Sequence, residues 1–229
     1  MSFHALSHQL PGFRGDAGWV HDREDRPWID GAPYWPGGDS GVTLRPGVDL
    51  GYADRSLVER NYKLQAPAKG WAAIESAFGL KGRAAKNCLA RDTRFQLIDI
   101  SYEEGKDLFP VVARPYWDGI VREFPDLLRE DVPGEVHTVF LSLSFNRGWA
   151  NPALDALRDA LRRYDFSRLA NLIGAMQQSH RLRGIRKRRR LEADKLRDMH
   201  VLATRAVGIS KVNPLPPDSL IRPASAVIQ

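Results

Sequence analysis

A glycine-bounded stretch at residues 40–52 is the feature that most constrains this chain. It reads Ser-Gly-Val-Thr-Leu-Arg-Pro-Gly-Val-Asp-Leu-Gly-Tyr, so two short segments of alternating apolar and polar residues flank Pro46-Gly47. Such alternation is typical of a strand with one buried face, and Pro-Gly is typical of a turn. The stretch therefore predicts a small hairpin.

The length of the turn decides which side chains of the hairpin face each other. A two-residue loop would pair Leu44 with Asp49 and leave Thr43 and Asp49 on opposite faces. A three-residue loop at residues 45–47, with Gly47 left-handed, sets Thr43 opposite Asp49 on one face. Because Pro46 is awkward in the middle of such a loop, we expect an irregular turn and a cavity that both side chains face.

A third polar residue, Glu24, lies upstream near the end of a helix predicted through Ala17 and Arg23. Two carboxylates and a hydroxyl beside a groove are the groups needed to hydrolyse a glycosidic bond. Each also has a structural interpretation. Glu24 can be a solvated residue at a helix end, Asp49 can cap the following turn, and Thr43 can simply occupy a strand position.

The composition is that of an ordinary globular protein with one core or two small lobes, at 229 residues, 43% hydrophobic and 27% charged. No apolar run approaches the roughly 20 residues that span a bilayer, and the first residues lack a secretion signal. We therefore expect a soluble protein.

The only cysteine, Cys88, excludes an intrachain disulfide and is expected to be a small buried side chain. The histidines show no metal-ligand spacing, so neither metal nor cofactor is expected.

The chain beyond the hairpin is predicted to be helical. Asp54 is expected to cap a first helix, and Ser101 opens a capping box before a helix that tolerates Pro110 as a kink. The most apolar run, residues 136–145, predicts a central helix; further helices are expected at 81–90, around 154–161, at 166–178 after Asp165, and at 186–203. The predicted architecture is α+β in a single domain, with a small lobe at about 15–65, a helical lobe at about 66–205 and an extended tail at 206–229.

The loop at residues 25–39 is rich in proline, glycine and aromatic residues. Trp28, Tyr34 and Trp35 have two interpretations: they stack on sugar faces beside the acids, or they pack the loop against the core.

Three stretches, in this order, resemble the phage-type lysozyme superfamily, particularly its pesticin-like branch. The first is the hairpin itself. Ser-Leu-Ser-Phe-Asn-Arg-Gly at 142–148 is similar to the SxxFNxG segment of the superfamily's central helix, and Gly-Ile-Arg-Lys-Arg-Arg-Arg-Leu-Glu-Ala at 184–193 is similar to its closing G-l-x-x-R-R-x-x-E helix. The matches span roughly residues 15–197, and they imply a lysozyme-like fold.

The resemblance implies that Glu24 is the general acid, Thr43 the catalytic threonine and Asp49 the aspartate that follows it in the pesticin-like branch. Other phage lysozymes have an aspartate six residues ahead of the threonine, where this chain has Gly37. A general acid at neutral pH needs an apolar setting, for which the neighbours Trp19, Val20 and Trp28 are candidates. Alternatives to Glu24 as the acid are Asp22, Asp30 and Asp39.

The activity implied is that of a muramidase, an endolysin-type glycosidase that cleaves the β-1,4 bond between N-acetylmuramic acid and N-acetylglucosamine in peptidoglycan and so lyses bacteria. Asn146 would bind the acetamido groups of the substrate or tie the hairpin to the central helix. Arg147 would meet the glycan or pair with an acid. The alternatives are a lytic transglycosylase and a non-catalytic protein that binds cell wall or nucleic acid.

The basic residues gather in one place. Residues 181–190 contain seven of the 34 lysines and arginines and no acid, so the remainder has 27 basic against 28 acidic residues. Such a cluster has three interpretations. It binds nucleic acid, or it is a solvated helix face. In the third, some of its arginines face the glycan or pair with acids, and the others attract the protein to an anionic cell envelope. No nucleic-acid-binding motif accompanies it, so an anionic envelope is the expected partner. We expect a monomer that stays in the host cytoplasm before reaching the periplasm and cell wall.

Overall fold

The hairpin is surrounded by helices in this computed structural model, which describes residues 10–24, 31–64 and 66–210, with side chains of the last helix described to Met199. The α-helices in this part of the chain are α1 (Ala17–Glu24), α2 (Arg55–Tyr62), α3 (Ala68–Ala77), α4 (Gly82–Arg91), α5 (Tyr102–Glu123), α6 (Gly134–Arg147), α7 (Arg158–Arg162), α8 (Phe166–Ala175) and α9 (Arg183–Ser210). Short 3₁₀ helices are η1 (Thr93–Leu97), η2 (Pro125–Leu128) and η3 (Pro152–Leu157). The fold is α+β.

Strands β1 (Thr43–Leu44) and β2 (Val48–Asp49) form the predicted antiparallel hairpin. Thr43 pairs with Asp49 and Leu44 with Val48, which confirms the three-residue turn. Gly47 has φ +81°, the left-handed conformation that the turn needs, and the Arg45–Pro46 peptide bond is cis. Tyr34 pairs with Thr43 from the other side, so the preceding loop is fastened to the hairpin.

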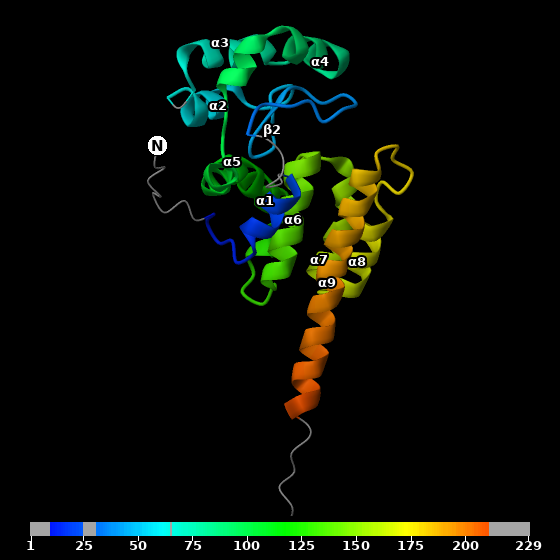
Figure 1. Cartoon of the computed structure of the whole chain (residues 1–229). Helices are drawn as coiled ribbons and strands as arrows, with labels where there is room; N and C mark the ends of the chain where they lie inside the picture. Colours follow the sequence, from blue (N-terminus) through cyan, green and yellow to red (C-terminus); the bar gives the residue numbers. More distant parts are fainter. Residues whose placement is uncertain (1–9, 25–30, 65, 211–229) are drawn as a thin grey trace, which may run out of the picture.

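Helix α6 is the central helix that its apolar sequence predicts. Every residue from Val136 to Ser144 is buried, because α1, α5 and α9 pack around it (Figure 1). Helix α8 packs along α9, so the two form the outer wall of the helical side.

Helices α2, α3 and α4 lie with the hairpin on the other side, and α5 runs beneath them (Figure 1). Local signals set these boundaries as predicted. The Asp54 carboxylate accepts a hydrogen bond from the amide of Leu57, and Ser101 and Glu104 form the reciprocal capping box that starts α5. Helix α5 continues through Pro110 and Pro115.

Three helix predictions differ from the structure. Residues 152–162 form η3 and α7 rather than one helix, beginning where the Asn151 side chain accepts from the amide of Ala153. Helix α8 ends at Ala175, and Gln177 has φ +56°, which ends helical geometry two residues later. Helix α9 begins at Arg183 and reaches Ser210. Most of the tail predicted for 206–229 lies outside the described residues.

None of the described helices is both long and apolar enough to cross a membrane. Cys88 is half-buried, so the prediction of full burial was too strong.

We expect Gly41 to be the least replaceable glycine of the hairpin. A Cβ at this position would collide with the backbone nitrogen of Gly51 and the carboxylate of Asp49. Gly41→Ala should therefore lower the free energy of unfolding by about 2 kcal/mol, measured by urea denaturation. Gly184→Ala is the control, since no atom lies within 4 Å of its added Cβ, and it should be neutral or stabilising. Equal effects would contradict the crowding at Gly41.

Candidate active site

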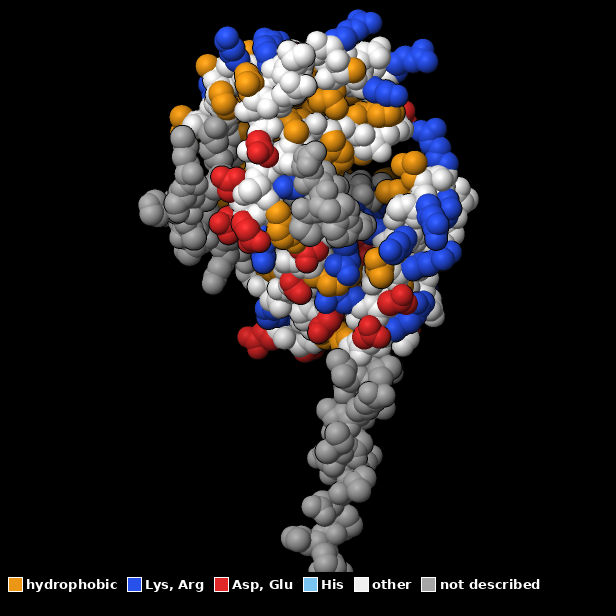
Figure 2. Space-filling model, viewed as in Figure 1, with side chains coloured by type: hydrophobic (Ala, Val, Ile, Leu, Met, Phe, Trp, Pro, Cys, Tyr) orange, Lys and Arg blue, Asp and Glu red, His pale blue; other side chains and the backbone are white. Residues whose placement is uncertain are grey.

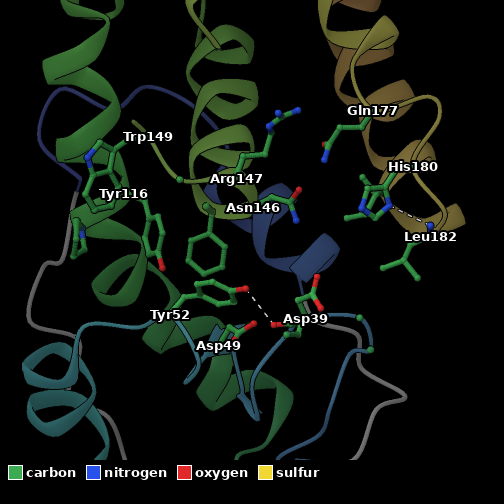
Figure 3. Close-up of a pocket in the computed structure, with 18 of the residues that line it drawn as sticks. Asp39, Asp49, Tyr52, Tyr116, Asn146, Arg147, Trp149, Gln177, His180 and Leu182 are labelled. Carbon is green, nitrogen blue, oxygen red and sulfur yellow. Dashed lines mark hydrogen bonds between the residues drawn. The ribbon is translucent and has the colours of Figure 1, made fainter. Parts of the chain in front are cut away.

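Two adjoining cavities separate the hairpin from the helical side, and together we call them the cleft (Figures 2 and 3). The larger has a volume of about 1130 Å³ and the smaller about 500 Å³. Asp49 and Asn146 line both, so the two cavities meet between the hairpin and the end of α6.

The three predicted catalytic residues lie together in the smaller cavity. Glu24, Thr43 and Asp49 all line it, although Glu24 comes from the end of α1 and the other two from the hairpin. The turn brings them close, because a Cβ added to Gly47 would lie 3.0 Å from the Cβ of Glu24. Thr43 is 3% exposed.

The carboxylate of Asp49 is fixed by the backbone of two glycines. Its Oδ1 accepts hydrogen bonds of 2.8 Å from the amides of Gly41 and Gly51. Burial raises the pKa of Asp49 above its ordinary value, although these hydrogen bonds act in the opposite direction. Its charged form is therefore costly in this position.

Tyr116 of α5 lies within electrostatic reach of both carboxylates. Burial raises the pKa of its hydroxyl, and the negative charges of Glu24 and Asp49 raise it further. Its ring lies 4.7 Å from Phe145 and 5.7 Å from Trp149, which places an aromatic group on the helical wall of the larger cavity. The sequence did not identify Tyr116 and Trp149 as candidate site residues, because aromatic residues in a helical region are equally typical of a core.

Glu24 forms an ion pair with Arg188 of α9. The side chains are 10% and 13% exposed, and the second guanidinium nitrogen of Arg188 donates to the carbonyl of Arg23 at 2.6 Å. The surroundings differ from those predicted. Val20 is in the core, Trp19 lies beneath the guanidinium of Arg23, and Trp28 is outside the described residues. The group that faces the Glu24 carboxylate is thus a cation.

A buried polar network sits behind this pair. Arg189 and Glu192 are 0% exposed and form an ion pair of 3.1 Å, and the Ser142 hydroxyl donates to Glu192 at 2.5 Å. Arg189 also donates to the Oδ1 of Asn146 at 3.0 Å. Asn146 is therefore tied to α9 rather than to the hairpin. Because its oxygen is occupied, its amide nitrogen is left to donate into the cleft.

The remaining predicted residues are divided between the cleft and its surroundings. Tyr34 lines the smaller cavity, and Arg147 lines the larger one. Trp35 lines neither; its indole nitrogen donates to the carbonyl of Ser40 at 3.0 Å and its ring packs against the core.

Two of the alternative acids also have defined positions. Asp22 contacts His21 and Tyr102 and lines neither cavity, whereas Asp39 lines the larger cavity. Asp30 is outside the described residues.

The basic cluster does not act as one surface. Arg188 and Arg189 turn inward and pair with acids, as described above. The exposed members are Arg181, Arg183, Lys187 and Arg190. Lysine and arginine side chains accordingly gather beside the hollow, over the start of α9 (Figure 2). In the described part of the chain, no group of three or more histidine, cysteine or acidic side chains is arranged to hold a metal ion.

We expect Glu192 to be essential for stability. Burial raises the pKa of Glu192 and lowers that of Arg189 to about 10, so each charge depends on its partner. Glu192→Gln leaves Arg189 buried without a counter-charge and should cost about 3 kcal/mol in the free energy of unfolding. Asp194→Asn is the matched control, because its pair with Arg197 is exposed, and it should cost less than about 1 kcal/mol. Similar losses in urea denaturation would refute the special role of Glu192.

Comparisons with known proteins do not assign the chain to a family, so the site is interpreted from its own geometry. No protein-family profile matches the chain, and no curated protein matches it significantly. The resemblance to phage-type lysozymes therefore rests on three short motifs and their order alone.

Proposed function

We propose that the protein is a lysozyme-like muramidase that hydrolyses the glycan strands of peptidoglycan. The observation that carries the proposal is the convergence of Glu24, Thr43 and Asp49, from two separate elements, on one cavity. The adjoining larger cavity gives a strand room to continue beyond the scissile bond. Aromatic and amide groups along the helical wall suit the faces and acetamido groups of sugars.

In the proposed reaction, Glu24 gives its proton to the glycosidic oxygen as the C1–O bond breaks. Water attacks C1 of the oxocarbenium-like sugar and passes a proton to Asp49. Thr43 lies opposite Asp49 in the hairpin, and in this proposal its hydroxyl orients that water. We propose inversion at C1, because a hydroxyl and a carboxylate side by side are suited to activating water.

The ion pair between Glu24 and Arg188 sets a condition on this mechanism. A guanidinium favours the charged form of a neighbouring carboxylate, whereas a general acid must begin with a proton. The contact must therefore loosen when the glycan enters. Once Glu24 has donated its proton, the same guanidinium stabilises the resulting carboxylate.

We also propose that the protein works alone on the cell wall, with no nucleic acid as partner, after leaving the cytoplasm of the host in which it is made. The exposed cations of the cluster suit an anionic envelope. Retention on DNA at physiological salt by a protein that leaves purified peptidoglycan uncut would instead favour a binding protein.

Glu24→Gln tests the proposed acid. It should lower clearing of purified peptidoglycan by about a thousandfold, because removal of a general acid costs two to four orders of magnitude. Asp22→Asn is the matched control, and it should keep wild-type activity. Zymography and turbidity measure both, and circular dichroism checks the fold. Near-wild-type clearing by Glu24→Gln would overturn the assignment.

The products identify the reaction class. Hydrolysis leaves reducing ends, whereas a lytic transglycosylase leaves anhydro-muramic ends, and mass spectrometry of the released fragments distinguishes them. We expect reducing ends. Anhydro products would replace the hydrolase with a transglycosylase.

Asp49→Asn should separate activity from stability. Activity should fall at least a hundredfold, while the amide oxygen still accepts from the backbone of Gly41 and Gly51. The raised pKa of Asp49 means that the unfolded chain loses this proton first, so wild-type stability falls as pH rises above about 4. The variant lacks that loss, and its stability relative to wild type should increase with pH in urea titrations. A variant that is less stable at pH 7 than at pH 4, relative to wild type, would contradict this.

A further inference from the structure

Arg147 forms no ion pair with any described residue. It ends α6 and lines the larger cavity. Its Nε is buried without a hydrogen-bond partner among the described residues, and its Nη2 has only a long contact of 3.4 Å with the Asn151 amide oxygen. Burial lowers its pKa. A half-buried guanidinium with a buried, unbonded nitrogen has a cost that a bound anion would offset.

Other polar groups lie near Arg147 on the helical side of the cavity. We call Arg147, Gln177, His180 and Arg181 the Arg147 wall; all four line the larger cavity, and Figure 3 labels the first three. The Nδ1 of His180 accepts from the amide of Leu182 at 3.1 Å, so the proton of the neutral ring is on Nε2. Arg181 is exposed and forms no ion pair with any described residue. The wall therefore offers several donors.

Two of the three carboxylates that line the same cavity have partners elsewhere, and the third, Asp39, forms no ion pair with any described residue. Asp39, Asp49 and Asp54 line the cavity from the hairpin side, as Figure 3 shows for the first two. Asp49 is held by two backbone amides, and Asp54 caps α2. The carboxylate that acts on Arg147 is Glu192, which is buried and paired with Arg189. The Arg147 wall is therefore open to an external anion.

We propose that the Arg147 wall binds a carboxylate of the peptide stem on a muramic acid residue of the substrate. This inference rests on the proposed function. In an intact strand the lactyl carboxyl of muramic acid is joined to the stem through an amide, so the free carboxylates belong to the stem. A guanidinium matches a carboxylate in shape and charge.

The test compares two substrates that differ only in charge. One consists of soluble glycan strands with uncrosslinked stems, and the other has the same stems with their carboxylates converted to amides. Wild type should have a kcat/KM about tenfold higher on the first, as expected for one charge-assisted hydrogen bond. Arg147→Met should reduce this preference to near one, and Arg122→Met, on an exposed arginine of α5 outside the cleft, should retain it.

A wild-type enzyme that cleaves both substrates equally would overturn the inference, as would an Arg147→Met variant that keeps the preference. Arg181→Met removes an exposed side chain, so it tests the wall even if Arg147→Met fails to fold, and it should lower the preference about threefold. An unchanged preference in Arg181→Met would also count against the wall.

Binding separates this inference from the proposed function. Titration calorimetry with Glu24→Gln, which should bind but not cleave, should give tighter binding of the charged strands by the same factor. If wild type cleaves neither substrate but this difference in affinity persists, the proposed function fails and the carboxylate site stands. Strands stripped of stems by an amidase expose the lactyl carboxylate. Equal binding of these strands would overturn the assignment to the stem.

Discussion

The buried ion pair between Arg189 and Glu192 is the interaction on which the helical side of the cleft depends. Both residues belong to α9 and have no exposure to solvent, and they face α6, where Ser142 donates a hydrogen bond to Glu192 and Asn146 accepts one from Arg189. Buried pairs rarely add stability compared with apolar side chains, but they fix one arrangement because any other leaves a charge unpaired. Here the hydrogen bonds of this pair to Ser142 and Asn146 of α6 set the rotation of α9, and with it which arginines face inward.

The hairpin forms the opposite wall of the cleft, and backbone contacts rather than an ion pair fix its position. Its strands have two residues each, too few to be stable alone. Their position instead depends on close backbone approach at Gly41 and Gly51, which leaves the Asp49 carboxylate held by main-chain amides. A side chain held by the backbone has little freedom to reorient, and such preorganisation is what a catalytic carboxylate needs.

The structural features that depend only on neighbouring residues could be predicted from the sequence. The turn at Gly47, the cap at Ser101 and the central helix over the apolar 136–145 run all follow from the residues themselves, and the structure has each of them. The sequence could not predict the contact of Glu24 with Arg188, because these residues are 164 positions apart and a run of arginines does not say which of them turns inward. For the same reason it did not distinguish Trp35, which supports the loop, from Tyr34, which lines the cavity.

The consecutive residues Arg188 and Arg189 are held in different ways, and the difference determines which part of the helical side can move. Arg189 is buried, so α9 cannot shift without exposing that charge or breaking the hydrogen bonds that join the network to Ser142 and Asn146 of α6. Among the described residues, Arg188 donates hydrogen bonds from its guanidinium to Glu24 and to the carbonyl of Arg23, both at the end of α1. Release of Glu24 therefore costs least as a rotation of the Arg188 side chain or a change at the end of α1, with α9 remaining in place. Under the proposed function, Glu24 can therefore be released for substrate by local movement at this contact, while α9 remains fixed by its hydrogen bonds to α6.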